Sequence, residues 1–189
     1  MSYQLKRNKK NLDRVKTALL IIDIQERILS VMQNPDRVVS NTIKLIKGFK
    51  VLNSPIYYTE QYPKGLGSTF SEIKTELDNL SAIQKMSFSC FGAENLFMEF
   101  KSKNIGQLVI AGIEGHVCVQ QTVLDLLANN FQVNLAADAV SSRNQFDYEI
   151  AINRMESHGA EITTTEAILF EMLNYSGTDE FKLISKIIK

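Results

Sequence analysis

The sequence predicts an α/β fold, a three-layer α/β/α domain built on a six-stranded, mostly parallel sheet. Short apolar or β-branched runs, each long enough for one strand, alternate with longer stretches in which apolar residues recur at helical spacing. Strands that alternate with helices form βαβ units, and their crossovers cover both faces of a parallel sheet. The length of 189 residues suits one domain, so we expect a single domain over residues 1–189 with a polar lead-in at 1–16.

Six segments have the pattern of strands. The first, Thr17–Asp23, is a continuous apolar run that ends in a carboxylate, as expected of a strand buried on both faces. The second begins at Pro55, directly after the turn-forming pair Asn53-Ser54. The others are short apolar or β-branched runs bounded by glycine or polar residues. The predicted strands are residues 17–23, 55–59, 82–85, 107–111, 132–137 and 160–163.

Helices are predicted between these strands. Asn34-Pro35 is a helix-opening pair, and Gly159 is a typical helix-ending residue. The glycines at 65 and 67 mark a loop, and Gly112–Gly115 is a tight connection from the fourth strand to the next helix. The predicted helices are about 35–52, 71–78, 93–103, 116–130, 147–158 and 164–174, followed by a C-terminal segment with helical spacing.

The composition is that of an ordinary globular chain, with 44% hydrophobic and 22% charged residues. Lys plus Arg and Asp plus Glu number 21 each, so the net charge is zero and no nucleic-acid partner is expected. The longest apolar run, Ala18–Ile22, is far shorter than the ~20 residues of a spanning helix, so no membrane partner is expected. Two cysteines cannot build a disulfide framework, which favours a cytoplasmic location.

The N-terminus carries a basic cluster at residues 6, 7, 9 and 10. No apolar stretch of signal-peptide length follows it, so a signal peptide is not expected. We interpret the cluster as a solvated tail, and a nuclear or anionic-surface tag is the alternative. Histidine occurs only at positions 116 and 158, so the sequence cannot assemble a His-rich metal site, and we expect neither a metal nor another cofactor.

Reactive side chains follow three of the predicted strands. Asp23 ends the first strand, Lys85 ends the third, and Cys118 opens the helix after the fourth. Ligands of open parallel sheets bind beyond the carboxyl ends of the strands, so these three groups can meet at one edge. A cation and a helix N-terminus both favour a thiolate, and a carboxylate can carry the thiol proton. The Gly112–Gly115 turn could direct backbone N–H groups at an oxyanion.

Each of these residues also has a purely structural explanation. An aspartate after a strand is commonly a turn or capping residue, and Lys85 could be a solvated charge. A free cysteine such as Cys118 is commonly a small buried hydrophobe, and Cys90 is predicted to be a core residue. His116 is a candidate for substrate contact at the start of a helix. The residues alone leave these alternatives open.

Three segments together resemble the motifs of the isochorismatase-like cysteine hydrolases. They are Leu20–Gln25, Ile83–Ser87 and Ala111–Thr122, in the order in which the family has them. The likeness runs from about Thr17 to Tyr175. The segment Thr59–Gly67 further resembles the eukaryotic-type subgroup of isochorismatase domain-containing proteins, whose physiological substrates are generally unassigned.

The resemblance implies a Rossmann-like sheet with strand order 3-2-1-4-5-6 and a site at the switch between the first and fourth strands. It implies that Cys118 is the nucleophile, Asp23 the proton carrier and Lys85 the charged third member of the triad. It also implies a non-proline cis peptide between Ile113 and Glu114, with the N–H groups of Glu114 and Cys118 as oxyanion donors. Gln25 occupies a position where family members place a polar residue that supports the site, so Gln25 joins His116 as a candidate substrate-binding residue.

Two departures from the family's patterns narrow the predicted function. Nicotinamidases of the family hold a metal with an Asp-x-His pair after the second strand, where this chain has Glu60-Gln61-Tyr62. True isochorismatases cleave a vinyl ether and do not need the cysteine, so Cys118 favours acyl transfer through a thioester. The predicted function is therefore metal-independent hydrolysis of a small amide-type C–N bond, and a metal-independent nicotinamidase-like amidase is an alternative.

A protein that keeps this fold for binding or scaffolding, without turnover, is the second class of function. The presence of Asp23, Lys85 and Cys118 together argues against it, and a redox thiol role lacks a Cys-x-x-Cys pair. The physiological substrate lies beyond the sequence. We also expect a homo-oligomer, a dimer or tetramer, from the family's habit and because the apolar residues of the C-terminal segment need burial. Those residues are Phe181, Ile184, Ile187 and Ile188.

Overall fold

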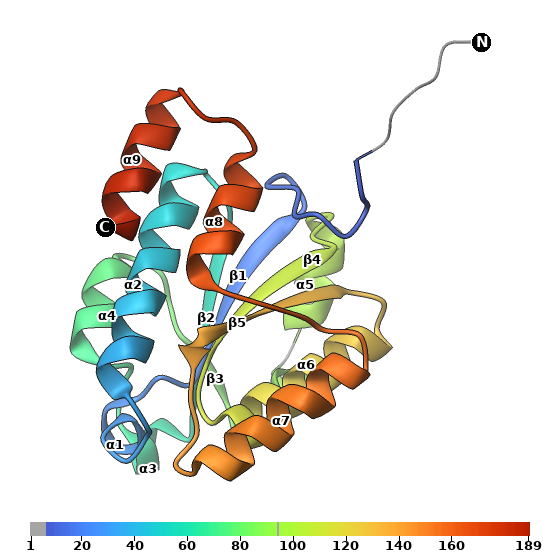
Figure 1. Cartoon of the computed structure of the whole chain (residues 1–189). Coiled ribbons are helices and arrows are strands. Elements are labelled where there is room, and N and C mark those ends of the chain that lie inside the picture. Colours follow the sequence, from blue (N-terminus) through green and yellow to red (C-terminus); the bar gives the residue numbers. More distant parts are fainter. Residues whose placement is uncertain (1–6, 94) are drawn as a thin grey trace.

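The computed structural model describes residues 7–93 and 95–189. Six strands form one sheet in the order β3-β2-β1-β4-β5-β6, and every neighbouring pair is parallel (Figure 1). The predicted α/β class, strand number and strand order are therefore confirmed. The strands are β1 Thr17–Ile22, β2 Ile56–Gln61, β3 Ile83–Lys85, β4 Gln107–Gly112, β5 Gln132–Val140 and β6 Glu161–Thr163.

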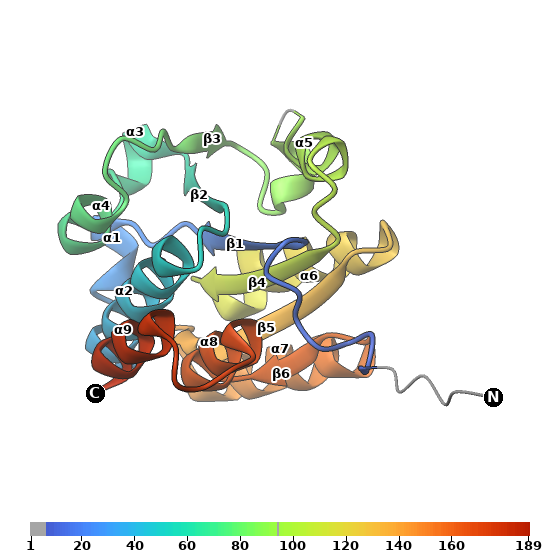
Figure 2. The same ribbon diagram turned by 90° about the horizontal axis from the view of Figure 1, so that it is seen from above.

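Helices cover both faces of the sheet, as the alternating pattern predicts (Figures 1 and 2). Successive residues of β1 face opposite layers. Leu19 and Ile21 pack with residues of α2, α4, α8 and α9, whereas Leu20 and Ile22 pack with residues of α5, α6 and α7. The helices are α1 Glu26–Leu29, α2 Pro35–Val51, α3 Pro63–Leu66, α4 Ser71–Glu76, α5 Leu96–Ser102, α6 Gln120–Ala128, α7 Gln145–Ser157, α8 Thr165–Leu173 and α9 Asp179–Ile188.

The structure differs from the sequence-based expectations at short elements. Helices α1 and α3 are single turns that the sequence analysis missed, and α3 lies where a loop was expected. The predicted helix at 116–130 begins instead as a π-helical turn, Gly115–Val119, before α6. Residues 1–6 of the expected polar lead-in and residue 94 of the predicted helix 93–103 lie outside the described residues.

The C-terminal helix α9 packs most of its apolar residues against its own chain, although Leu183 stays exposed. Ile184 is fully buried, Phe181 packs against Phe170 at 6.3 Å between ring centroids, and Ile187 and Ile188 lie against the same core. Helices α2 and α8 of the same chain supply these contacts, so the apolar residues of the segment do not by themselves require a second copy.

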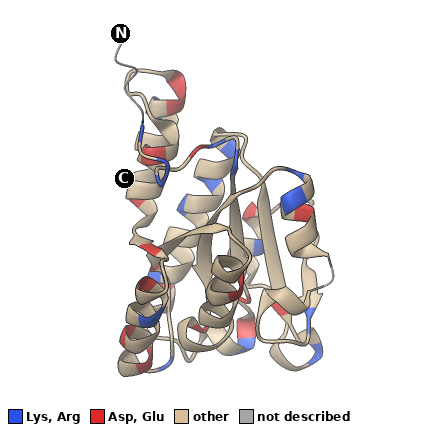
Figure 3. Cartoon of the chain, turned by 90° about the vertical axis from the view of Figure 1, so that its right-hand side faces the viewer, with Lys and Arg blue, Asp and Glu red and all other residues tan. Residues whose placement is uncertain are grey.

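The surface carries charges of both signs. In the view of Figure 3, acidic and basic residues are interspersed over the outer helices. In the described ranges, no helix is both long and apolar enough to cross a membrane.

Glycine is required where β4 ends beside β1. Gly112 has a φ of 143°, a conformation that residues with a side chain rarely adopt. A Cβ atom there would lie 2.3 Å from the Ile22 carbonyl oxygen and 2.8 Å from its amide nitrogen. The absence of a side chain therefore lets the two central strands approach closely at the edge where Asp23 and the π-helical turn follow.

Candidate active site

Asp23 follows the last residue of β1, at the point where the strand order reverses. Its φ of 52° lies in the left-handed region, which aspartate tolerates better than most residues. Its carboxylate is buried, and each oxygen has a partner. Oδ1 accepts a hydrogen bond of 2.7 Å from the Thr59 hydroxyl, and Oδ2 accepts one of 2.6 Å from the Lys85 ammonium. Asp23 is thus a fixed anion inside the protein rather than an exposed turn residue.

Lys85 ends β3 with a side chain that has no exposed surface. Besides Asp23, its Nζ donates to the Gln61 Oε1 at 3.1 Å and to the carbonyl oxygens of Phe88 at 2.9 Å and Ser87 at 3.2 Å. A buried cation is tolerated only when it is paired and its protons are satisfied, and these oxygens do both. The interpretation of Lys85 as a solvated charge was therefore wrong.

Cys118 lies on the π-helical turn ahead of α6. Its Sγ is 3.1 Å from the Gln61 Oε1, which accepts from the thiol. Burial raises the pKa of the Cys118 thiol, the Asp23 carboxylate raises it further, and Lys85 only partly opposes them. Lys85 lowers the pKa, as the sequence analysis expects of a nearby cation, but burial and the Asp23 charge act in the opposite direction. The Cys118 thiol is the candidate nucleophile.

Cys90 is fully buried on a short 3₁₀ turn, Cys90–Gly92, as predicted for a core residue. Its sulfur is 4.0 Å from the Thr59 hydroxyl oxygen. Burial raises the pKa of this thiol to about 11. The Cys90 amide donates to the Thr122 hydroxyl at 2.9 Å, and that hydroxyl donates to the Cys118 carbonyl oxygen at 2.7 Å.

The peptide bond between Ile113 and Glu114 is cis, as the resemblance implies. The Glu114 carboxylate is buried and accepts from Arg143, with Nε 2.7 Å from Oε1. His116 lies beside it, with Nε2 3.6 Å from the other carboxylate oxygen and Nδ1 3.0 Å from the Ser142 hydroxyl. The structure thus places His116 against Glu114 and Ser142, and His116 itself is not among the residues that line the cavity at Cys118.

Gln25, the other candidate substrate-binding residue, is fully buried and holds the chain around the end of β2. Its Nε2 donates to the carbonyl oxygens of Gln61 at 3.0 Å and Gly67 at 2.6 Å, and its Oε1 accepts from the Gln61 amide at 2.8 Å. These bonds fix the backbone of Gln61, whose side chain contacts both Cys118 and Lys85. Gln25 supports the site and does not line its cavity.

Cys118 faces a cavity of about 310 Å³. Besides Cys118, the polar residues that line it are Asp23, Gln61, Glu114 and Arg143. Its walls are apolar, formed by Ile28, Leu66, Phe88, Ile113 and Val117.

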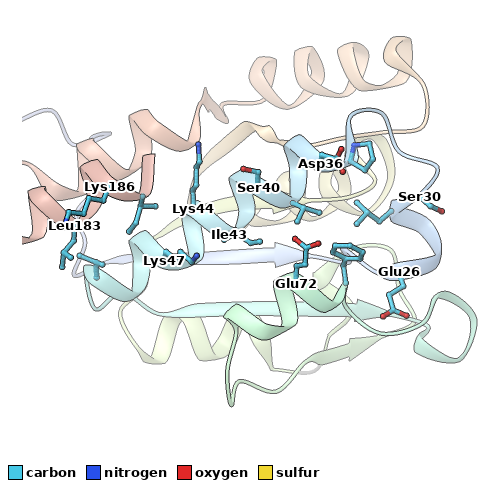
Figure 4. Close-up of a pocket in the computed structure, with 16 residues that line it drawn as sticks. Glu26, Ser30, Asp36, Ser40, Ile43, Lys44, Lys47, Glu72, Leu183 and Lys186 are labelled. Atoms are coloured by element: carbon cyan, nitrogen blue, oxygen red, sulfur yellow. The ribbon is translucent and has the colours of Figure 1, made fainter. Parts of the chain in front are cut away.

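A larger hollow of about 900 Å³ lies elsewhere, between α2, α4 and α9. In Figure 4, lysines such as Lys44 and Lys186 lie toward one end and Glu26 and Asp36 toward the other. Neither cysteine borders it, so the smaller cavity is the candidate active site. Among residues 7–93 and 95–189, no group of three or more His, Cys, Asp or Glu side chains is placed to hold a metal ion.

Comparison with known proteins shows the family of this chain. The Isochorismatase domain matches residues 17–167 of the chain. The chain belongs to the isochorismatase family. Isochorismatase family protein 1B of Dictyostelium discoideum is 38% identical over 177 residues, which cover 92% of this chain and 86% of that protein.

Two solved structures of this fold are informative. The structure described as the MAR1 ribonuclease from Caenorhabditis elegans has a TM-score of 0.87 and 35% sequence identity, covering 94% of this chain and 92% of that one. The YcaC gene product from Escherichia coli has a TM-score of 0.89 and 24% identity, covering 97% and 91%, and is described as an octameric hydrolase of unknown specificity. The YcaC likeness concerns the fold alone.

Two contacts of this isochorismatase-family site were missed by the sequence analysis. Thr59 and Gln61 lie on β2, and both side chains reach the cluster around Asp23 and Lys85. The available signal was weak: both are polar residues near the carboxyl end of a strand predicted to lie beside the first. Only the register of β2 against β1, in which Ile22 pairs with Thr59, brings them to Asp23.

Proposed function

We propose that this chain is a cysteine hydrolase that cleaves a small amide-type C–N bond through a thioester on Cys118. One observation carries the proposal. Cys118, Asp23 and the buried Lys85 lie in one hydrogen-bonded cluster, and Cys118 and Asp23 line a small, mostly apolar cavity. A thiol next to a carboxylate that can accept its proton is the arrangement that nucleophilic acyl transfer requires.

In the acylation step, the Cys118 thiol gives its proton to Asp23 as the sulfur attacks the carbonyl carbon of the substrate. The C–N bond then breaks, and Asp23 returns the proton to the departing nitrogen. Because burial and Asp23 both raise the thiol pKa, proton transfer accompanies the attack instead of preceding it. Lys85 stays bound to Asp23 and offsets the cost of a buried carboxylate.

The turn after β4 supplies a hydrogen-bond donor for the developing oxyanion. Within the described ranges, no oxygen accepts from the Glu114 backbone N–H, so this group is available. The Cys118 N–H is the second donor in our proposal. In deacylation, Asp23 takes a proton from water as its oxygen attacks the thioester, and the proton then returns to the departing sulfur, which restores the thiol.

The description of the C. elegans relative as a ribonuclease suggests a second candidate activity. The cavity here argues for a small substrate, because its volume is about 310 Å³ and its lining is largely apolar with a single Arg. An RNA-cleaving site needs cationic groups along the phosphate backbone. We therefore keep amide hydrolysis as the proposal and include RNA in its test.

The proposal also covers assembly and location. The octamer described for YcaC supports a homo-oligomer for this chain, and two free cysteines suit the reducing cytoplasm. Light scattering at micromolar concentrations tests the first point: a monomer mass would contradict it.

The test of the activity is ammonia release from a panel of small amides and ureides. We expect the wild type and Cys90→Ala to release ammonia and Cys118→Ala to release none. We also expect mass spectra to show an acyl adduct on the wild-type peptide that contains Cys118. Cleavage of RNA that is equal in the wild type and Cys118→Ala would indicate a different activity. Absence of both reactions would favour the silent binding protein.

A further inference from the structure

The large hollow between α2, α4 and α9 has an apolar lining and charges of opposite sign toward its two ends (Figure 4). Ile43, Phe70 and Ile187 line it and are only partly buried. Leu183 lines it as well and is 48% exposed. Apolar surface that gathers in one place on a folded protein marks an interaction site.

The charges along the hollow are available to a partner. Toward the basic end, the Lys186 ammonium binds no acceptor among the described residues, whereas Lys47 is paired with Glu76. Toward the acidic end, the carboxylates of Asp36 and Glu72 accept no hydrogen bond within the described ranges. An occupant that satisfies the whole hollow is therefore apolar, with an acidic group on one side and a basic group on the other.

Helix α7 offers such a surface. Phe146 is 67% exposed and Ile150 is 52% exposed, and because they are four residues apart they form one ridge on the helix. Glu149 and Arg154 are also exposed, and each lies three or four residues from a member of this pair, so both border the ridge. The ridge thus carries an acidic group toward the N-terminal half of α7 and a basic group toward its C-terminal end.

The dimensions and positions of the two surfaces suit a contact between copies. Helix α7 has 13 residues and is roughly 20 Å long, and α2, which runs the length of the hollow, has 17 residues and is roughly 26 Å long. Helix α7 packs on one face of the sheet, whereas α2, α4 and α9 pack on the other. The ridge therefore cannot enter the hollow of its own chain.

We propose that the hollow takes α7 of a second copy of this chain, with Phe146 and Ile150 against the apolar lining. When α7 lies antiparallel to α2, Glu149 points toward the lysine end and Arg154 toward Glu72. The contact is heterologous, because each copy offers a ridge and a hollow on different surfaces, and its repetition can close a ring. The inference rests on the proposed function only for the existence of a homo-oligomer, and it names the surfaces that form it.

The test measures the mass of the full chain and of two variants by light scattering at micromolar concentrations. The ridge variant is Phe146→Ser/Ile150→Ser. The hollow variant is Leu183→Glu/Lys186→Glu. Each should have a smaller mass than the wild type, with subunit affinity lowered at least about 100-fold, as expected when two central interface residues are lost. All four side chains are exposed, so both variants should fold, and thermal unfolding checks this.

An equimolar mixture of the two variants gives the decisive result. The hollow variant keeps an intact ridge and the ridge variant keeps an intact hollow, so one contact can still form between them. The mixture should therefore contain a species heavier than either variant alone. The matched control Val15→Ser/Met98→Ser removes two apolar side chains, of residues that are 80% and 66% exposed elsewhere, and should keep the wild-type mass.

Wild-type mass in either variant would overturn the proposal and leave a homo-oligomer formed through other surfaces standing. A mixture without a heavier species would overturn it too, because only a ridge-to-hollow contact can be complemented in this way. A monomeric wild type would contradict both the proposal and the assembly in the proposed function. Ammonia release by the wild type tests the amide chemistry separately, since none of the four substituted residues lines the cavity at Cys118.

Discussion

The two cysteines occupy neighbouring but different surroundings. Both are buried, both have raised thiol pKa values, and the Thr122 hydroxyl links the Cys90 amide to the Cys118 carbonyl oxygen. Yet the Cys118 sulfur meets the Gln61 amide oxygen and borders the cavity, whereas the Cys90 sulfur lies in the core. The comparison teaches that a raised thiol pKa does not separate the candidate nucleophile from a core thiol here. What separates them is a proton acceptor and space for a substrate.

The largest expected effect comes from removing one sulfur or the other. Cys118→Ala should reduce turnover to the uncatalysed background, while Cys90→Ala should keep it within a few-fold, because only Cys118 can form the thioester. Each substitution trims one small buried atom, so each should cost on the order of 1 kcal/mol of stability. Initial rates on an active amide and thermal unfolding check both statements. Full activity in Cys118→Ala would contradict the proposed role of Cys118 as the nucleophile.

Asp23→Asn should lower kcat by ~10²–10⁴-fold, the usual effect of losing a positioned acid–base group. It also leaves the Lys85 ammonium buried without a counter-charge, which typically costs about 3–5 kcal/mol. The double variant Asp23→Asn/Lys85→Met removes both charges and should recover much of that stability without recovering activity. Chemical denaturation of the single and double variants measures this, and an unaltered stability of Asp23→Asn would contradict the buried ion pair.

The pH dependence of alkylation sharpens the comparison further. Since the pKa of each thiol is raised, the thiolate fraction at pH 7 is below that of an ordinary cysteine. The thiolate fraction, and with it the labelling rate, should therefore grow about tenfold per pH unit from 7 to 9. It should not level off near ~8.5, the pKa of an ordinary cysteine. Cys118 should still be labelled before Cys90, because it borders the cavity. Peptide mapping after brief alkylation decides it, and first labelling of Cys90 would reverse our assignment.

The smallest effect concerns Lys85. Its positive charge lowers the pKa of the Cys118 thiol, so Lys85→Met should slow labelling of Cys118. Faster labelling in this variant would contradict the stabilising effect of the Lys85 charge on the Cys118 thiolate.

The sequence was sufficient for the parts of the site that follow directly from chain order. Asp23 and Lys85 end apolar runs and Cys118 follows one, so a parallel sheet must bring them to the same edge. The roles of Thr59 and Gln61 depend on the register between β1 and β2, which no local pattern specifies. The pKa of the Cys118 thiol likewise depends on its burial and on the ion pair that Lys85 forms with Asp23, and both arise only in the folded chain.

Short elements escaped prediction for a related reason. Helices α1 and α3 have four residues each, too few to display a helical period. The residues of α9 did show that period, but a pattern of apolar residues does not say which surface receives them. Here the receiving surface is α2 and α8 of the same chain.

The close approach of β4 to β1 has a consequence for anyone who maps this protein by saturation mutagenesis. Any side chain at Gly112 collides with the backbone of Ile22 and distorts the edge from which Asp23 and the Cys118 turn emerge. Gly112 would therefore score as intolerant as the nucleophile itself, although it carries no chemistry. A fitness map would separate the two only if protein abundance were recorded beside activity, since Gly112→Ala depletes the folded protein and Cys118→Ala does not.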